Sequence, residues 1–145
     1  MDITADLDAD LPADVLRATV ADLGTYPRWL DIVARAVPLD DGGALPAWSV
    51  DLRGQIGPLR RSKRLRMERT VDEADHLRFE RRELDGREHS PWVMEGRLRP
   101  RPGGTVLTMR LHYGGSLWVP LLDRLLRDEI ERSRPRLVDE ASLNV

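Results

Sequence analysis

Cysteine is absent from this chain of 145 residues, so disulfide bonds, thiolate metal ligands and thiol nucleophiles are excluded. The three histidines, His76, His89 and His112, do not have the spacing of a metal site. We therefore expect no metal and no cofactor. The sequence contains no motif that identifies catalytic residues, and these stay unknown at this stage.

Long apolar runs and an excess of charge of one sign are also missing. No segment approaches the ~20 apolar residues of a membrane helix, and the acidic start MDITADLDAD lacks the features of a signal peptide. Lys and Arg number 23 against 25 Asp and Glu, which gives no general attraction for nucleic acid or acidic membranes. We expect a cytoplasmic protein without a nucleic-acid partner or integral membrane association.

Aromatic residues make up only 5% of the chain, yet Tyr26 and Trp29 flank Pro27 and Arg28 in one short segment. Apolar residues at helical spacing predict a helix over residues 12–23, which Gly24 would end. Pro27 suits the first turn of a second short helix, which would extend over residues 27–33. These two helices would follow a first strand, indicated by alternating apolar residues over positions 3–7.

The rest of the chain changes from strand-like to helical periodicity at Gly114 and Gly115. Turn signals recur before that point, and the segments between them alternate apolar and polar residues. They predict an antiparallel meander of strands at 36–39, 47–56, 59–71, 76–84, 91–99 and 105–113. A long amphipathic helix should follow over residues 118–142, and Pro135 should bend or break it.

Strand alternation divides the meander into an apolar face and a charged face. Arg81 and Glu83 fall on the apolar face, where an unpaired charge is costly. They could orient an acidic or carbonyl-bearing ligand, or pair with each other. They could instead lie near a strand end or beyond a bulge, where the face reaches water.

Three segments carry a resemblance to a known family. Leu23-Gly24-Thr25-Tyr26-Pro27-Arg28-Trp29, the pair Gly114-Gly115, and LLDRLLRDEI at 121–130 resemble elements of the START / Bet v1-like (SRPBCC) superfamily, in particular its polyketide-cyclase and lipid-transport-like bacterial branch. The resemblance implies an α+β helix-grip fold in a single domain over residues 1–145. A curved seven-stranded antiparallel sheet would wrap around the C-terminal helix, with two short helices between strands 1 and 2 and a cavity between sheet and helix.

The leading functional hypothesis is the binding of a small hydrophobic or amphipathic molecule, lipid- or polyketide-like, by a monomer or weak homodimer. The alternatives are a polyketide cyclase/aromatase-like enzyme that uses general acid/base groups in the pocket, and a regulatory or toxin–antitoxin-type interaction protein without a ligand. The expected cavity-lining residues are Trp29, Trp48, Val50, Leu65, Met67, Phe79, Arg81, Glu83, Trp92, Met94, Met109, Leu111, Tyr113, Trp118, Leu122 and Leu125. Trp29 could equally be filler between the small helices and the sheet.

Overall fold

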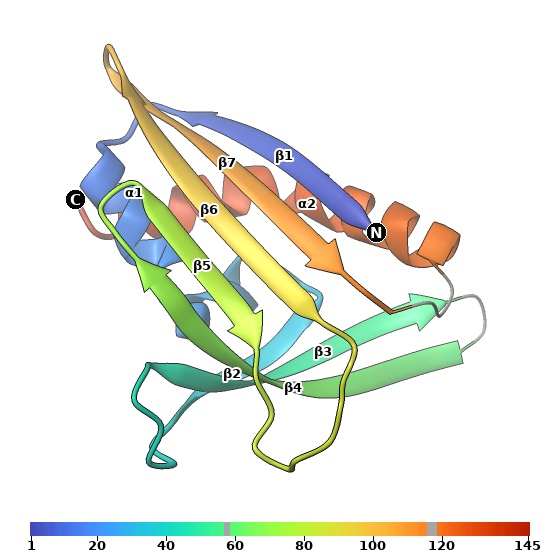
Figure 1. The fold of residues 1–145 in the computed structure, drawn as a ribbon. Coiled ribbons are helices and arrows are strands. Elements are labelled where there is room, and N and C mark those ends of the chain that lie inside the picture. Colours follow the sequence, from blue (N-terminus) through green and yellow to red (C-terminus); the bar gives the residue numbers. More distant parts are fainter. Residues whose placement is uncertain (57–58, 116–118) are drawn as a thin grey trace.

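The computed structural model describes residues 1–56, 59–115 and 119–145. Seven strands, two α-helices and one 3₁₀-helix make up the fold (Figure 1). In chain order they are β1 (Asp2–Ala9), α1 (Ala13–Val20), η1 (Leu23–Arg28), β2 (Val33–Leu39), β3 (Ala47–Ile56), β4 (Leu59–Asp72), β5 (His76–Arg81), β6 (Trp92–Arg101), β7 (Gly104–Tyr113) and α2 (Val119–Ser142).

The strands form one antiparallel sheet with the order β1-β7-β6-β5-β4-β3-β2. Strands β2 to β7 follow one another as the predicted meander, and β1 closes the order beside β7, so β1 and β2 are the two edges. The sheet curves around α2, which lies along its concave side (Figure 1). The predicted α+β helix-grip architecture is therefore confirmed.

The β6–β7 connection shows how local sequence sets this register. Arg101 pairs with Gly104, so only Pro102 and Gly103 form the turn. Gly103 has a φ of 77°, a left-handed conformation that glycine adopts without the steric penalty of a side chain. This turn aligns two ten-residue strands, β6 and β7, which lie between β1 and β5 in the sheet.

The two small helices exist, but the predicted boundaries were wrong. Helix α1 ends at Val20, and η1 already begins at Leu23 because the Asp22 side chain accepts a hydrogen bond from the Gly24 backbone N–H at 2.9 Å. Asp22 was a recognisable helix N-cap. Pro27 consequently lies inside η1 rather than at the start of a helix, and residues 29–32 connect η1 to β2.

Two strand boundaries differ from the predicted ones by three residues, and the others agree within two. Strand β2 begins at Val33, three residues before the predicted start, because a register irregularity between Val33 and Arg35 disrupts the expected alternation. Strand β5 ends at Arg81, three residues before the predicted end. Beyond it, the Glu83 carboxylate accepts a hydrogen bond from the Arg66 backbone N–H, a donor that a neighbouring strand would otherwise satisfy.

Helix α2 continues through Pro135, so this proline does not break the helix, and the bend expected there stays a prediction. Leu137 and Ala141, which follow the proline, are buried in the core. Their burial anchors the last turns and offsets the loss of one backbone donor. Among the helices described, none combines the length and apolarity needed to cross a lipid bilayer.

Candidate functional site

The concave side of the sheet is not completely filled by side chains. A cavity of about 150 Å³ lies between the sheet and α2, and its walls come from β1, η1, residues 29–33, β3, β4, β6, β7 and α2. Its lining is predominantly aliphatic and aromatic, with flexible methionines on three different strands. Within the described part of the chain, this apolar cavity is the candidate functional site.

Eight of the expected residues line this cavity. They are Trp29, Val50, Leu65, Met67, Trp92, Met94, Met109 and Leu111. Seven of them belong to strands, and Trp29 directly follows η1. Trp29 thus forms part of the cavity wall. Its ring also packs against the Tyr26 ring, with 4.3 Å between the two ring centroids.

The structure places seven other expected residues away from the cavity walls, and Trp118 lies outside the described residues. The seven are Trp48, Phe79, Arg81, Glu83, Tyr113, Leu122 and Leu125. Alternation assigned the correct face to Trp48 and Phe79, which are buried, but they occupy a solid part of the core. The Phe79 ring packs edge-on against Trp48 at 5.9 Å and Tyr26 at 6.4 Å between centroids, so this aromatic cluster fills the space.

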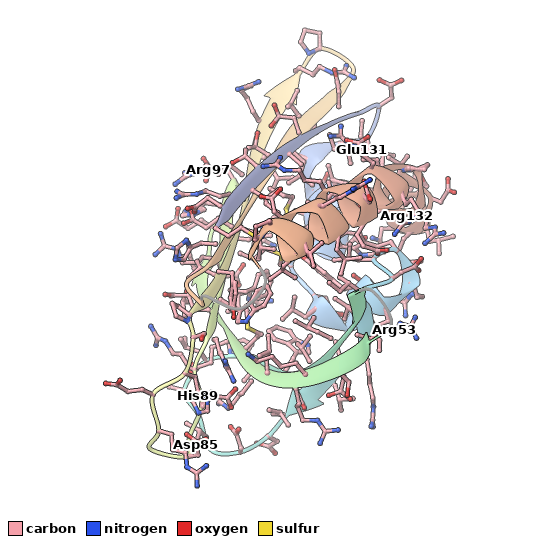
Figure 2. All side chains as sticks on the ribbon, turned by 90° about the vertical axis from the view of Figure 1, so that its right-hand side faces the viewer. Arg53, Asp85, His89, Arg97, Glu131 and Arg132 are labelled. Carbon is pink, nitrogen blue, oxygen red and sulfur yellow. The ribbon has the colours of Figure 1, made fainter. Side chains whose placement is uncertain are left out.

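Arg81 and Glu83 form an ion pair instead of facing the cavity. The Arg81 Nε donates to the Glu83 carboxylate at 3.0 Å, and an Arg81 Nη donates to the Ser90 carbonyl at 3.2 Å. His89 is the third neighbour of Arg81. It lies in the β5–β6 connection, and its ring pairs with the Asp85 carboxylate (Figure 2). Of the alternatives drawn from the sequence, the structure therefore shows the pairing of Arg81 with Glu83.

Helix α2 lines the cavity further along its length than predicted. Leu126, Ile130, Ser133 and Leu137 line it, at the i, i+4, i+7 and i+11 positions of one helical stripe. Leu122 precedes Leu126 by one turn on the same side of the helix, but it packs partly buried against the core and does not line the cavity, and neither does Leu125. The helical spacing in the sequence indicated this side of the helix, but not where along the helix the cavity lies.

Polar groups at the cavity walls are few. The Tyr26 hydroxyl donates to the Val20 carbonyl at 2.8 Å, and burial raises the pKa of this phenol well above its ordinary value. The Ser133 hydroxyl donates to the Ile130 carbonyl, also at 2.8 Å. Glu129, on α2, also lines the cavity, and no sequence pattern had indicated this residue.

Glu129 is buried and holds α2 against the chain that precedes β2. Its Oε2 accepts the Ile32 backbone N–H at 3.2 Å, and its Oε1 accepts from the Arg132 guanidinium. Arg132 itself extends from the outer side of α2 (Figure 2).

Comparison with known proteins agrees with the geometry. The sequence matches the profile of the family described as polyketide cyclase / dehydrase and lipid transport over residues 1–141. A comparison with curated protein sequences finds no significant match.

Several solved structures share the fold over nearly the whole chain. A Thermus thermophilus protein is 16% identical with a TM-score of 0.77, covering 99% of this chain and 98% of the other. A START superfamily protein from Mycobacterium smegmatis is 17% identical with a TM-score of 0.71, covering 99% of each chain. The Zhui aromatase/cyclase from a Streptomyces species is 13% identical with a TM-score of 0.66, covering 98% of this chain and 93% of the other.

At these identities the structural similarities are similarities of fold alone, and the profile match is what identifies the family. Because that match extends over residues 1–141, this protein belongs to the polyketide cyclase / dehydrase and lipid transport family.

Proposed function

We propose that this protein binds a small apolar or amphipathic molecule in the cavity between the sheet and α2. The observation that carries the proposal is the unfilled apolar space itself. Protein interiors are normally close-packed, and side chains around a void lose the dispersion contacts that a neighbour would supply. An apolar ligand in this space would restore those contacts and bury its own surface.

The cavity volume limits the size of the occupant. An apolar cavity of ~150 Å³ in another protein stays dry and accepts benzene, whereas drug-sized ligands occupy ~300–1,000 Å³. The volume of about 150 Å³ here therefore suits a molecule with the dimensions of a single ring. A lipid chain or a multi-ring polyketide would require the cavity to expand, and Met67, Met94 and Met109 are side chains that adapt easily.

A cyclase-like enzyme is the second candidate, and Glu129 is the observation in its favour. A buried carboxylate beside a bound substrate could act as a general acid or base. An interaction protein without a ligand is less well supported, because that hypothesis expects a filled interior.

Titration with toluene, followed by tryptophan emission, tests the binding proposal. Trp29 and Trp92 line the cavity, so their emission should change saturably as toluene enters. The variant Val50→Phe adds bulk at a cavity-lining position and should abolish the saturable change. The control is Val37→Phe, the same substitution on the adjacent strand at a residue that pairs with Ser49 and is not part of the cavity lining.

Circular dichroism should first show that both variants are folded, since overpacking costs ~1–3 kcal/mol. Equal toluene binding by wild type and Val50→Phe would place the ligand elsewhere. No binding of toluene by the wild type would overturn the proposal.

A further inference from the structure

We infer that Glu129 recognises a hydrogen-bond donor on the ligand, so that the preferred occupant is a small, uncharged molecule with a hydroxyl group, such as a phenol, rather than a carboxylate. This inference rests on the proposed ligand-binding function and specifies the chemistry of the same cavity. It assigns the role of polar recognition group to a residue on α2, in place of Arg81 on β5.

The carboxylate of Glu129 has hydrogen-bonding capacity left over. An ionised carboxylate has about four lone-pair sites for donors. Within the described residues, Glu129 accepts one bond from Ile32 and one from Arg132, so about half of this capacity is used. The residue is 7% exposed, and water has little access to the remaining sites. A donor on a bound ligand would fill them.

Two other charged residues at the cavity walls direct their charged groups to the opposite side of the sheet. Asp6 accepts from the Thr108 hydroxyl at 2.7 Å. Arg110 donates to the Asp2 carboxylate at 3.2 Å. Their neighbours on the same strands, such as Ala5 and Met109, line the cavity. Because strand side chains alternate between faces, these two charges are removed from ligand recognition.

The two side-chain hydroxyl groups of Tyr26 and Ser133 at the walls are already engaged. Tyr26 and Ser133 each donate their hydroxyl hydrogen to a backbone carbonyl of their own neighbourhood. Their oxygens are weaker acceptors than a carboxylate, because hydrogen bonds to an ionised acceptor are roughly twice as strong as neutral ones. Glu129 is therefore the strongest acceptor that these walls offer to a ligand.

Arg134 is the competing recognition group, because it is a cation at the wall whose Nε is buried without a partner among the described residues. Its Nη atoms, however, pair with Glu131 at 3.0 Å and with the Asp6 carbonyl at 2.5 Å. Glu129 and Arg132 likewise form a pair. The wall therefore has no cation in excess, and a carboxylate ligand would be desolvated without a free counter-charge.

Four ligands built on one benzene ring separate these possibilities: toluene, phenol, anisole and benzoate. Phenol and toluene have nearly the same shape, so their affinity ratio isolates the hydroxyl group. We expect phenol to bind about tenfold more tightly than toluene, since one well-placed bond to an ionised acceptor is worth roughly that factor. Anisole, which has no donor, should bind no more tightly than toluene, and benzoate should bind most weakly.

The variant Glu129→Gln should reduce the preference for phenol over toluene to about twofold while toluene affinity stays within about twofold, because an amide oxygen is a neutral acceptor. The matched control is Glu140→Gln. Glu140 also lies on α2 and ties this helix to η1 through Arg28 at 2.6 Å, but it does not line the cavity. This control should retain the wild-type preference for phenol. If Glu129→Gln fails to fold, the wild-type ligand series decides.

Each alternative result has a distinct meaning. Equal binding of phenol and toluene by the wild type, or an unchanged preference in Glu129→Gln, overturns the inference and leaves the proposed function intact. Tighter binding of benzoate overturns it in favour of Arg134, and tighter binding of anisole in favour of a donor such as the Trp92 indole, whose N–H is buried without a partner among the described residues. If toluene does not bind at all, the proposed function fails and this inference fails with it.

Discussion

Arg81 and Glu83, two residues apart at the end of β5, form an ion pair with 3.0 Å between Nε and Oε1. The Arg81 side chain is only 7% exposed. The same Glu83 oxygen also accepts the Arg66 backbone N–H at 3.0 Å, so the pair connects the end of β5 to β4. The Arg81–Glu83 pair thus adds a contact between β4 and β5 beyond the last paired residues of the two strands. It lies beside the core instead of in the cavity.

The variant Arg81→Met should therefore change stability and not ligand binding. Removing one member of a buried ion pair leaves the other uncompensated, and we expect the free energy of unfolding to fall by about 3 kcal/mol. Urea denaturation measures this change. Toluene and benzoate affinities should each stay within about twofold of the wild type, and a loss confined to benzoate would restore Arg81 to the binding site.

Arg66 should matter more for stability than its exposed neighbour on the same face of β4, Arg64. The buried Arg66 guanidinium bonds to both Asp41 oxygens at 2.8 and 3.0 Å and to Glu68 at 2.8 Å. The Arg64 side chain is 70% exposed and pairs only with Asp51 among the described residues.

We expect Arg66→Met to lower the free energy of unfolding by about 3 kcal/mol and Arg64→Met by less than about 1 kcal/mol. Chemical denaturation of the two variants under the same conditions provides the comparison. Equal losses would mean that burial of the guanidinium has no energetic weight here.

The Asp41–Arg66 pair should also make stability depend on pH. Hydrogen bonding to the Arg66 guanidinium holds the pKa of Asp41 below its ordinary value. The fold thus favours the ionised carboxylate, and its contribution is complete above the unfolded pKa of ~3.9 and is lost as pH falls through the lower folded pKa.

The difference in stability between wild type and Asp41→Asn should accordingly be largest near pH 6 and shrink below about pH 4. Thermal denaturation from pH 6 to pH 2.5 measures this difference. Comparing the two proteins at each pH cancels the contribution of carboxyl groups that titrate alike in both. A difference that stays constant over this range would contradict the role of the pair.

The sequence indicated the face on which a strand residue lies, but not the depth of that residue within the molecule. Val50 and Trp48 are two residues apart on β3 and share the concave face. Val50 reaches the cavity, whereas Trp48 packs into the aromatic cluster with Phe79. The distinction depends on where α1 and η1 cover the sheet, and this is a property of tertiary packing that alternation cannot reveal.

The extent of the cavity along α2 was similarly beyond local pattern. Leu122 and Leu126 are one turn apart on the same side of the helix, and only Leu126 lines the cavity. Helical periodicity indicates a side of the helix, whereas the position of the cavity along the helix depends on tertiary packing. Glu129 escaped prediction for a related reason, because a charged residue on an amphipathic helix is normally assigned to the solvent side.

Methyl NMR of the methionines tests the central claim most directly. The chain has four methionines, and Met67, Met94 and Met109 line the cavity while Met1 does not. With ¹³C-methyl methionine, we expect toluene to shift the signals of the three cavity methionines along one saturable curve and to leave Met1 unchanged. Shifts of Met1 alone, or no saturable shift of Met67, Met94 and Met109, would contradict ligand binding in this cavity.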